Sequence, residues 1–239
     1  MAIAHARIDR FLSEKLNISR RAIRLMLAQK RILVDGQPIE EIGQIIHRFS
    51  HIVVDNKIIQ AEQPTYLMLH KPIGVVSATV DDKHQTVIDL LSVANKKSLH
   101  IVGRLDLNTS GLLLLTDDSR WSERLMSPEH KVAKKYLVTL ENPLTSEYVD
   151  AFAQGMYFEY EDITTLPAKL TIISTFQCEV TLFEGKYHQI KRMFGRFQNP
   201  VVALHRQSIG SLVLPNDIAV GEYRALTQAE EIEIFIDQS

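Results

Sequence analysis

The chain has a single cysteine and no long apolar run, and each shortage excludes a class of protein. Cys178 is the only cysteine in 239 residues, which excludes an internal disulfide and a cysteine-rich zinc site. Its alternating apolar surroundings indicate a buried strand residue. No apolar stretch approaches the roughly 18 to 20 residues that span a bilayer, and the first residues are polar, unlike a signal peptide. We therefore expect a cytoplasmic protein without membrane contact.

Several familiar catalytic patterns are also missing. The sequence holds no Gly-x-x-x-x-Gly-Lys-[Ser/Thr] loop, no Gly-x-Gly-x-x-Gly fingerprint, no His-Glu-x-x-His pair and no Gly-x-Ser-x-Gly turn. Most ATP, dinucleotide, zinc-protease and serine-hydrolase sites are thereby excluded. The nine histidines are scattered, without a pair at ligand spacing.

The net charge of −2 conceals two regions of opposite sign. Residues 1–60 carry ten Lys/Arg and six Asp/Glu, which gives +4, and residues 61–239 carry the other 17 and 23, which gives −6. Residues 7–31 alone hold eight basic and two acidic residues, a local charge of +6. A basic block of this density is typical of a surface that meets phosphate.

The basic block has the pattern of two short helices followed by a hairpin. Apolar residues recur at helical spacing in residues 8–16, and Ser19 is placed to cap a second helix. The polar side of that helix carries Arg20, Arg21 and Arg24. Residues 32–34 and 52–54 are predicted to pair as strands. A solvated basic helix is the simplest interpretation, but the clustering of arginines favours RNA.

A short polar segment with a proline, residues 61–65, separates this region from the rest. We therefore predict a domain of residues 1–60, a linker of residues 61–65 and a larger domain of residues 66–239. The larger domain shows many short strands, few helices and no regular strand–helix–strand repeat, which is typical of an α+β protein with a largely antiparallel sheet. Its predicted strands are 66–70, 112–115, 136–140, 168–174, 179–183, 212–214 and 222–226, and its predicted helices are 86–91, 119–126, 145–154 and 187–194.

The chain is organised around Gly-Arg-Leu-Asp (103–106), a polar loop and four consecutive leucines, Leu112 to Leu115. Four leucines in a row predict a strand buried on both faces. Glycines bracket the loop and would hold Asp106 rigidly at the strand edge, facing a cleft. A carboxylate fixed there can act as a nucleophile, a general base or a metal ligand.

Two kinds of chemistry stay open on the residues alone. Basic groups are spread over Lys71, Arg104, Lys135, Lys191 and Arg192, and they favour an anionic polymer as substrate. Tyr136 and His188 are able to stack on a base taken out of its helix. The alternative is a metal-dependent RNA hydrolase that uses Asp106 with Asp117 and Asp118, although these two stand where a helix cap is needed.

Three N-terminal runs resemble the S4 RNA-binding domain. They are Arg-Ile-Asp-Arg-Phe-Leu (7–12), Ser-Arg-Arg-Ala-Ile-Arg (19–24) and Ile-Leu-Val-Asp-Gly (32–36). The resemblance covers about residues 7–60. It implies that the helical pair and the hairpin present a basic face to structured RNA.

The larger domain resembles RNA pseudouridine synthases in four ordered segments. Residues 103–118 resemble the catalytic motif of the family, and residues 71–74, 135–138 and 184–193 resemble its other segments. The likeness is greatest to the RsuA type, which modifies 16S ribosomal RNA, but related enzymes acting on 23S RNA share all four segments. The implied fold is a small S4 domain followed by a mixed, mainly antiparallel sheet with a central cleft.

The resemblance implies the isomerisation of uridine to pseudouridine, without a metal or cofactor. Asp106 would be the essential carboxylate, either as nucleophile at the sugar or as the base that starts elimination. Tyr136 would pack against the flipped base, and Lys191, an arginine in many relatives, would pair with Asp106. RNA contacts are expected from Lys71, Arg104, His188 and Arg192.

The implied partner is ribosomal RNA, 16S in the first place, or a pre-ribosomal small-subunit particle. We expect a monomer. Two alternatives stay open: the same reaction on 23S RNA, and a non-catalytic RNA-binding factor in ribosome assembly.

Overall fold

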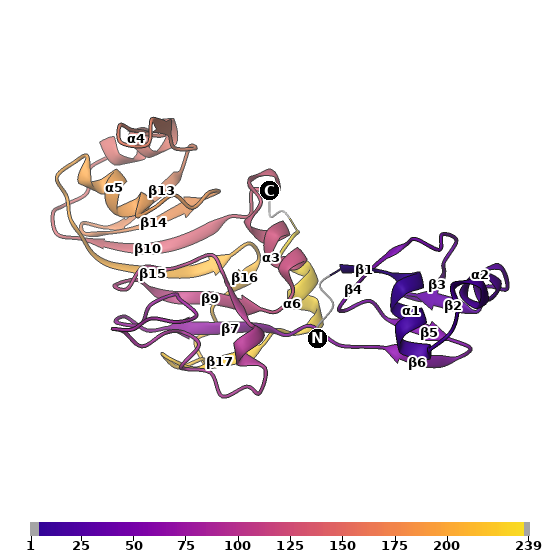
Figure 1. Ribbon diagram of the computed structural model, residues 1–239. Helices are drawn as coiled ribbons and strands as arrows, with labels where there is room; N and C mark the ends of the chain where they lie inside the picture. Colours follow the sequence, from indigo (N-terminus) through magenta and orange to yellow (C-terminus); the bar gives the residue numbers. More distant parts are fainter. Residues whose placement is uncertain (1–4, 237–239) are drawn as a thin grey trace. The chain divides into compact units, whose positions relative to one another are not determined.

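The computed structural model describes residues 5–236 and divides into two compact units between Pro64 and Thr65 (Figure 1). This boundary falls at the end of the proline-containing segment that the sequence marks as a linker. Each unit has its own apolar core.

The N-terminal unit packs two helices against short strands. Its helices are α1 (Ile8–Leu16) and α2 (Arg20–Ala28), and its strands are β1 (His5–Arg7), β2 (Ile32–Val34), β3 (Gln37–Pro38), β4 (Ile45–His47), β5 (Ile52–Val54) and β6 (Lys57–Gln60). β2 pairs with β5, as predicted, in the order β3-β2-β5-β6, and β1 pairs with β4. The Ser19 hydroxyl accepts a hydrogen bond from the Ala22 amide, so the predicted cap of α2 is confirmed.

The larger unit is built on a nine-stranded sheet (Figure 1). Its main path is β13 (Lys169–Ser174), β14 (Gln177–Leu182), β10 (Lys134–Leu140), β15 (Val201–Ile209), β9 (Ser110–Thr116), β7 (Tyr66–Lys71) and β17 (Tyr223–Ala225), with β8 (His100–Val102) paired to β9 and β16 (Leu212–Val213) to β15. β15 runs parallel to β9, and the other pairings of this sheet are antiparallel. The mixed, mainly antiparallel sheet predicted from the sequence is therefore confirmed.

Helices cover both faces of this sheet. They are α3 (Ser119–Met126), α4 (Glu147–Gln154), α5 (Gln189–Gly195) and α6 (Gln228–Glu233); a separate two-stranded ribbon joins β11 (Tyr157–Phe158) to β12 (Ile163–Thr164). Phe152 of α4 and Phe194 of α5 share one apolar cluster, whereas Trp121 of α3 belongs to the other. Figure 1 shows α4 and α5 together near β13 and β14.

β9 is the strand that the four leucines predicted. Leu112 and Leu114 belong to the cluster of α3, and Leu113 and Leu115 to the opposite cluster, so the strand is buried on both faces. A strand with no exposed face is a rigid support for the loop that precedes it.

Two expectations about the elements need correction. Residues 86–91 form turns instead of a helix, because the Asp89 carboxylate accepts hydrogen bonds from the amide and hydroxyl of Thr86 and closes a local turn. β15 has no counterpart among the predicted strands, since its polar run from His205 to Ser208 hides the strand pattern. It nevertheless lies between β10 and β9.

Candidate active site

Asp106 lies in the loop between β8 and β9, and hydrogen bonds fix the backbone of that loop. The Thr109 amide donates to the Asp106 carbonyl (3.0 Å), and the Gly74 amide donates to the Leu107 carbonyl (2.9 Å). The Ser77 hydroxyl donates to the Leu105 carbonyl (2.7 Å). The loop is thus tied to the segment that follows β7.

Lys71, at the end of β7, lies beneath this loop and is fully buried. Its ammonium donates to the carbonyls of Pro72 (2.9 Å), Asp106 (3.0 Å) and Thr109 (2.8 Å). Burial lowers the pKa of Lys71 to about 8, although the nearby Asp106 carboxylate opposes this shift. The expected RNA contact at Lys71 is therefore corrected: this side chain holds the loop from inside.

Arg206 of β15 is a second buried cation, one that the sequence analysis missed. Its Nε donates to the Leu112 carbonyl (2.7 Å) and its Nη2 to the Gly103 carbonyl (3.1 Å), so it joins both ends of the Asp106 loop. Gly111 has a φ of +112°, and a Cβ there would lie 2.3 Å from the Arg206 carbonyl oxygen. Only glycine fits where β9 and β15 approach in parallel.

Two side chains of the α5 segment meet the Asp106 carboxylate. Lys191 Nζ lies 3.0 Å from Oδ2, and His188 Nε2 lies 3.3 Å from Oδ1. His188 immediately precedes α5 with a φ of +49°, and Lys191 stands in its first turn. The structure thus brings together three predicted site residues, although Lys191 is 85 positions from Asp106 in the sequence.

A cavity of about 90 Å³ opens in front of this ion pair. Tyr136 of β10, which is 8% exposed, forms part of its wall, together with the apolar side chains of Leu182, Ile190 and Leu204. Asp106 is the only carboxylate among the described residues that line the cavity. A wider groove of about 730 Å³ shares Arg104, Asp106 and His188 with it.

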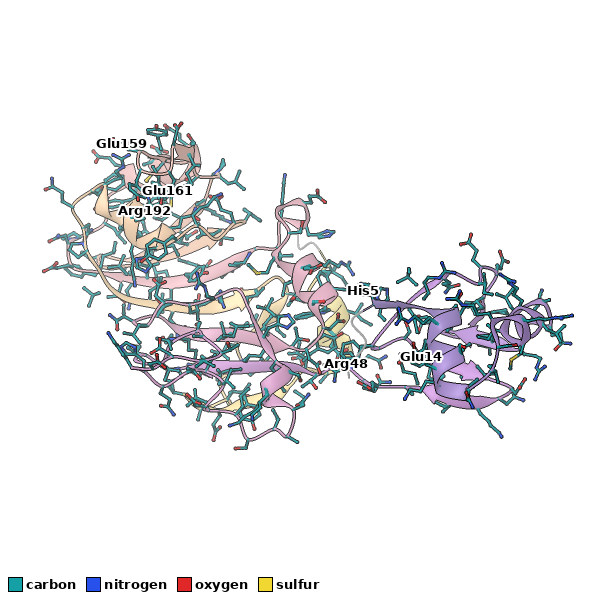
Figure 2. The ribbon with its side chains drawn as sticks, viewed as in Figure 1. His5, Glu14, Arg48, Glu159, Glu161 and Arg192 are labelled. Atoms are coloured by element: carbon teal, nitrogen blue, oxygen red, sulfur yellow. The ribbon has the colours of Figure 1, made fainter. Side chains whose placement is uncertain are left out.

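The other predicted cations lie apart from the carboxylate. Arg104 is exposed and lines both the cavity and the groove. Arg192 of α5 makes two hydrogen bonds to Glu161 (2.7 and 2.5 Å) and lies over the ring of Phe158, away from both linings. Figure 2 shows Arg192 and Glu161 near each other. The exposed arginines of α2 are Arg20, Arg21 and Arg24.

Asp117 and Asp118 have structural partners at the far end of β9. The Asp118 carboxylate accepts from the amides of Arg120 and Trp121 and caps α3, as predicted. The Asp117 carboxylate accepts from the Thr65 amide (2.7 Å). The seven residues of β9 span about 20 Å, so these carboxylates do not join Asp106 in one metal site. Within residues 5–236, no group of three or more His, Cys, Asp or Glu side chains is arranged around a metal position.

A search of the helices in the described part of the chain finds none that combines the length and apolarity needed to cross a membrane.

Comparisons with known proteins agree with this geometry. A family model described as RNA pseudouridylate synthase matches residues 65–195, and one described as S4 domain matches residues 6–53. The chain is 46% identical over 227 residues to ribosomal small subunit pseudouridine synthase A of Pseudomonas aeruginosa, covering 95% of this chain and 98% of the relative. It is 41% identical over 225 residues to the protein of the same name from Escherichia coli K12, covering 94% and 97%.

A solved structure, described as the crystal structure of pseudouridylate synthase, is similar with a TM-score of 0.70 at 37% identity, covering 96% of this chain and 99% of that one. The family match and the relatives, together with the carboxylate beside a small cavity, identify the chain as an RNA-modifying enzyme. The chain belongs to the RNA pseudouridylate synthase family, with an S4 domain ahead of the catalytic unit.

Proposed function

We propose that this protein isomerises a specific uridine of small-subunit (16S) ribosomal RNA to pseudouridine. The observation that carries the proposal is the Asp106–Lys191 ion pair at a cavity walled by Tyr136. The relatives named for the small ribosomal subunit support the choice of RNA. The protein would act as a monomer in the cytoplasm, on 16S RNA or on a pre-ribosomal small-subunit particle.

The reaction rearranges bonds within one nucleotide. The N1–C1′ bond breaks, the base rotates, and a C5–C1′ bond forms; C5 gives up a proton and N1 gains one, so the composition is unchanged and no co-reactant is needed. Asp106 serves as the nucleophile at the sugar or as the base that starts elimination. Lys191 would orient the carboxylate for either role.

The place of Asp106 at a small cavity favours a target uridine that leaves its helix. Enzymes that act on a base within a duplex flip that base into a pocket, and the cavity beside Asp106 would receive it. Tyr136 and the apolar walls pack against the base. By displacing water, they also strengthen the electrostatic contacts of Asp106.

The N-terminal unit would supply affinity through its exposed arginines Arg20, Arg21 and Arg24. Contacts of this kind reach phosphates and do not select a base. In the catalytic unit, Arg104 and His188 line the groove beside the target and would contact the RNA backbone, with Arg192 further out.

The test uses purified protein with unmodified 16S RNA and, separately, 23S RNA. We expect pseudouridine at one position of 16S RNA. Asp106→Asn keeps the shape of the side chain and removes its charge, so we expect activity to fall by several orders of magnitude while RNA binding persists. Product in 23S RNA alone would correct the target and leave the chemistry intact.

The alternative is a non-catalytic assembly factor, which the exposed basic surface of α2 also allows. It predicts no pseudouridine in either RNA and an Asp106→Asn variant with unchanged growth and affinity. Either full activity in this variant or no product from the wild type would overturn the assignment as an isomerase.

A further inference from the structure

Two stacked rings, Tyr187 and His188, line the wider groove beside the cavity. Their centroids are 3.9 Å apart and their planes differ by 17°. His188 Nε2, at the edge of the imidazole ring, lies 3.3 Å from Asp106 Oδ1, so the stacked pair adjoins the carboxylate through His188. Tyr187 is 69% exposed. Because His188 covers one face of the tyrosine ring, the exposed area includes the opposite face.

The backbone around this pair is fixed. The Tyr187 carbonyl accepts from Arg192 Nη1 (3.4 Å), and the Arg192 amide donates to the His188 carbonyl (3.0 Å). Glu161 accepts two hydrogen bonds from the same guanidinium. An aromatic ring whose position is set in advance loses little conformational freedom when it binds a ligand.

Tyr187 lines the wider groove of about 730 Å³ but not the inner cavity of about 90 Å³. Because the groove shares Arg104, Asp106 and His188 with the inner cavity, nucleotides next to a base in the cavity would lie in the groove. When a uridine flips out, its neighbour loses a stacking partner. An exposed aromatic ring beside the flipped nucleotide replaces that lost contact.

We propose that the exposed face of Tyr187 stacks on the base of a nucleotide adjoining the target uridine. This inference rests on the proposed function and adds a binding residue outside the reacting cavity. This stacking favours RNA in which the target uridine is flipped out. It does not distinguish one neighbouring base from another, because every base presents a π-face.

The first experiment measures binding of 16S RNA in an Asp106→Asn background, where the RNA stays unmodified. Tyr187→Leu keeps an apolar side chain without a π-face, and we expect its affinity to fall by roughly 5- to 150-fold. Tyr187→Phe keeps the ring and should recover most of that affinity. The matched control is Tyr160→Leu, since Tyr160 is 95% exposed in the loop between β11 and β12 and lines neither space; it should bind like the parent.

The second experiment uses a fragment of 16S RNA around the mapped uridine, with each neighbouring nucleotide made abasic in turn. At one neighbouring position, loss of the base should weaken RNA binding by the protein that has Tyr187. The same loss should not weaken RNA binding by Tyr187→Leu any further. Equal affinity of the tyrosine and leucine proteins, or additive losses at every neighbour, would overturn the proposal. Failure of the wild type to form pseudouridine would instead overturn the proposed function. The two failures are distinguishable, because the binding comparison with full-length RNA does not depend on turnover.

Discussion

The two units of this protein differ in how deeply their functional cations are buried. In the N-terminal unit, Arg20, Arg21 and Arg24 are exposed on α2, and Arg20 Nε also lies 3.6 Å from the buried Asp9 carboxylate. In the catalytic unit, Lys71 and Arg206 are buried and donate to backbone carbonyls, and Lys191 is paired with the Asp106 carboxylate. Exposed charge attracts an anionic polymer over a distance that salt screens. Buried or paired charge instead fixes the position of the catalytic loop and of its carboxylate. Affinity and catalysis should therefore be separable by mutation.

The largest effect is expected where fixed charge meets the reacting carboxylate. Lys191→Met keeps the length of the side chain but removes the ammonium 3.0 Å from Asp106 Oδ2. By analogy with the loss of one charge-stabilising donor, we expect kcat to fall by about 100- to 1000-fold. The measurement is the single-turnover rate at saturating RNA.

Lys191→Arg is the matched control, because it keeps the positive charge and adds a second donor. It should retain most of the activity, in keeping with the arginine expected in related enzymes. If the methionine and arginine variants were equally slow, the shape of the lysine would matter and its charge would not.

The exposed charge is tested by replacing Arg20, Arg21 and Arg24 together with glutamine. Each arginine that meets a phosphate contributes about one unit to the dependence of log Kd on log salt, so the slope should fall by about three units. Binding weakens, while the rate at saturating RNA is unchanged. The measurement is a salt titration of Kd beside a single-turnover assay. An unchanged slope would show that α2 does not face the RNA.

A third prediction concerns the buried lysine beneath the loop. Burial lowers the pKa of Lys71 to about 8, so the folded protein loses this proton between pH 8 and the ordinary value of 10.5, while the unfolded chain keeps it. The unfolded chain then binds more protons, and the contribution of Lys71 to stability rises with pH in this window. A neutral amine has only two N–H donors for three carbonyls, so the loop loosens. We expect kcat to fall several-fold above pH 8 without a parallel loss of stability from this group.

Lys134 provides the control for that pH profile. Burial also lowers its pKa to about 8, but its ammonium donates to the Val132 carbonyl, outside the Asp106 loop. Lys134→Met should therefore keep the alkaline decline of kcat. A decline that disappears in this variant, or a flat wild-type profile up to pH 9, would contradict the assignment to Lys71.

The sequence predicted those parts of the site whose residues follow one another in the chain or repeat at a regular spacing. The buried strand β9 and the cap of α3 were predicted correctly because local sequence patterns determine them. The resemblance to pseudouridine synthases pointed to Asp106, Tyr136 and Lys191, and all three line one cavity.

The sequence did not predict which charged side chains are buried. Lys71 appeared to be an RNA contact because lysine is rarely buried, and only the three carbonyls above it explain its place. Arg206 was missed together with β15, since polar residues in a central strand contradict the usual apolar pattern. In both cases the partners are backbone carbonyls, and the sequence does not show where those carbonyls point. The sequence alone therefore does not distinguish the exposed cations of α2 from the buried cations that support the Asp106 loop.

The smallest predicted effect concerns charge used for neither RNA nor chemistry. The Glu230 carboxylate of α6 accepts hydrogen bonds from Arg224 Nη1 and Nη2 (2.7 and 2.6 Å) and from the Thr227 amide (2.8 Å). The Arg224 guanidinium, with Thr227, lowers the pKa of Glu230 to about 2 from 4.5. The stabilising contribution is therefore complete above pH 4.5 and is lost as the pH falls towards 2.

Glu230→Gln keeps the amide-accepting geometry of the helix cap but loses the charge. We expect the free energy of unfolding to fall by about 1 kcal/mol at pH 7 and by much less near pH 3, with kcat unchanged. Glu231→Gln is the control on the same helix, because burial raises the pKa of Glu231 and its charged form is disfavoured in the fold; this change should not destabilise at pH 7. Denaturant titrations at the two pH values measure both. An equal loss for Glu230→Gln at pH 3 and pH 7 would show that packing, and not the ion pair with Arg224, stabilises this end of the catalytic unit.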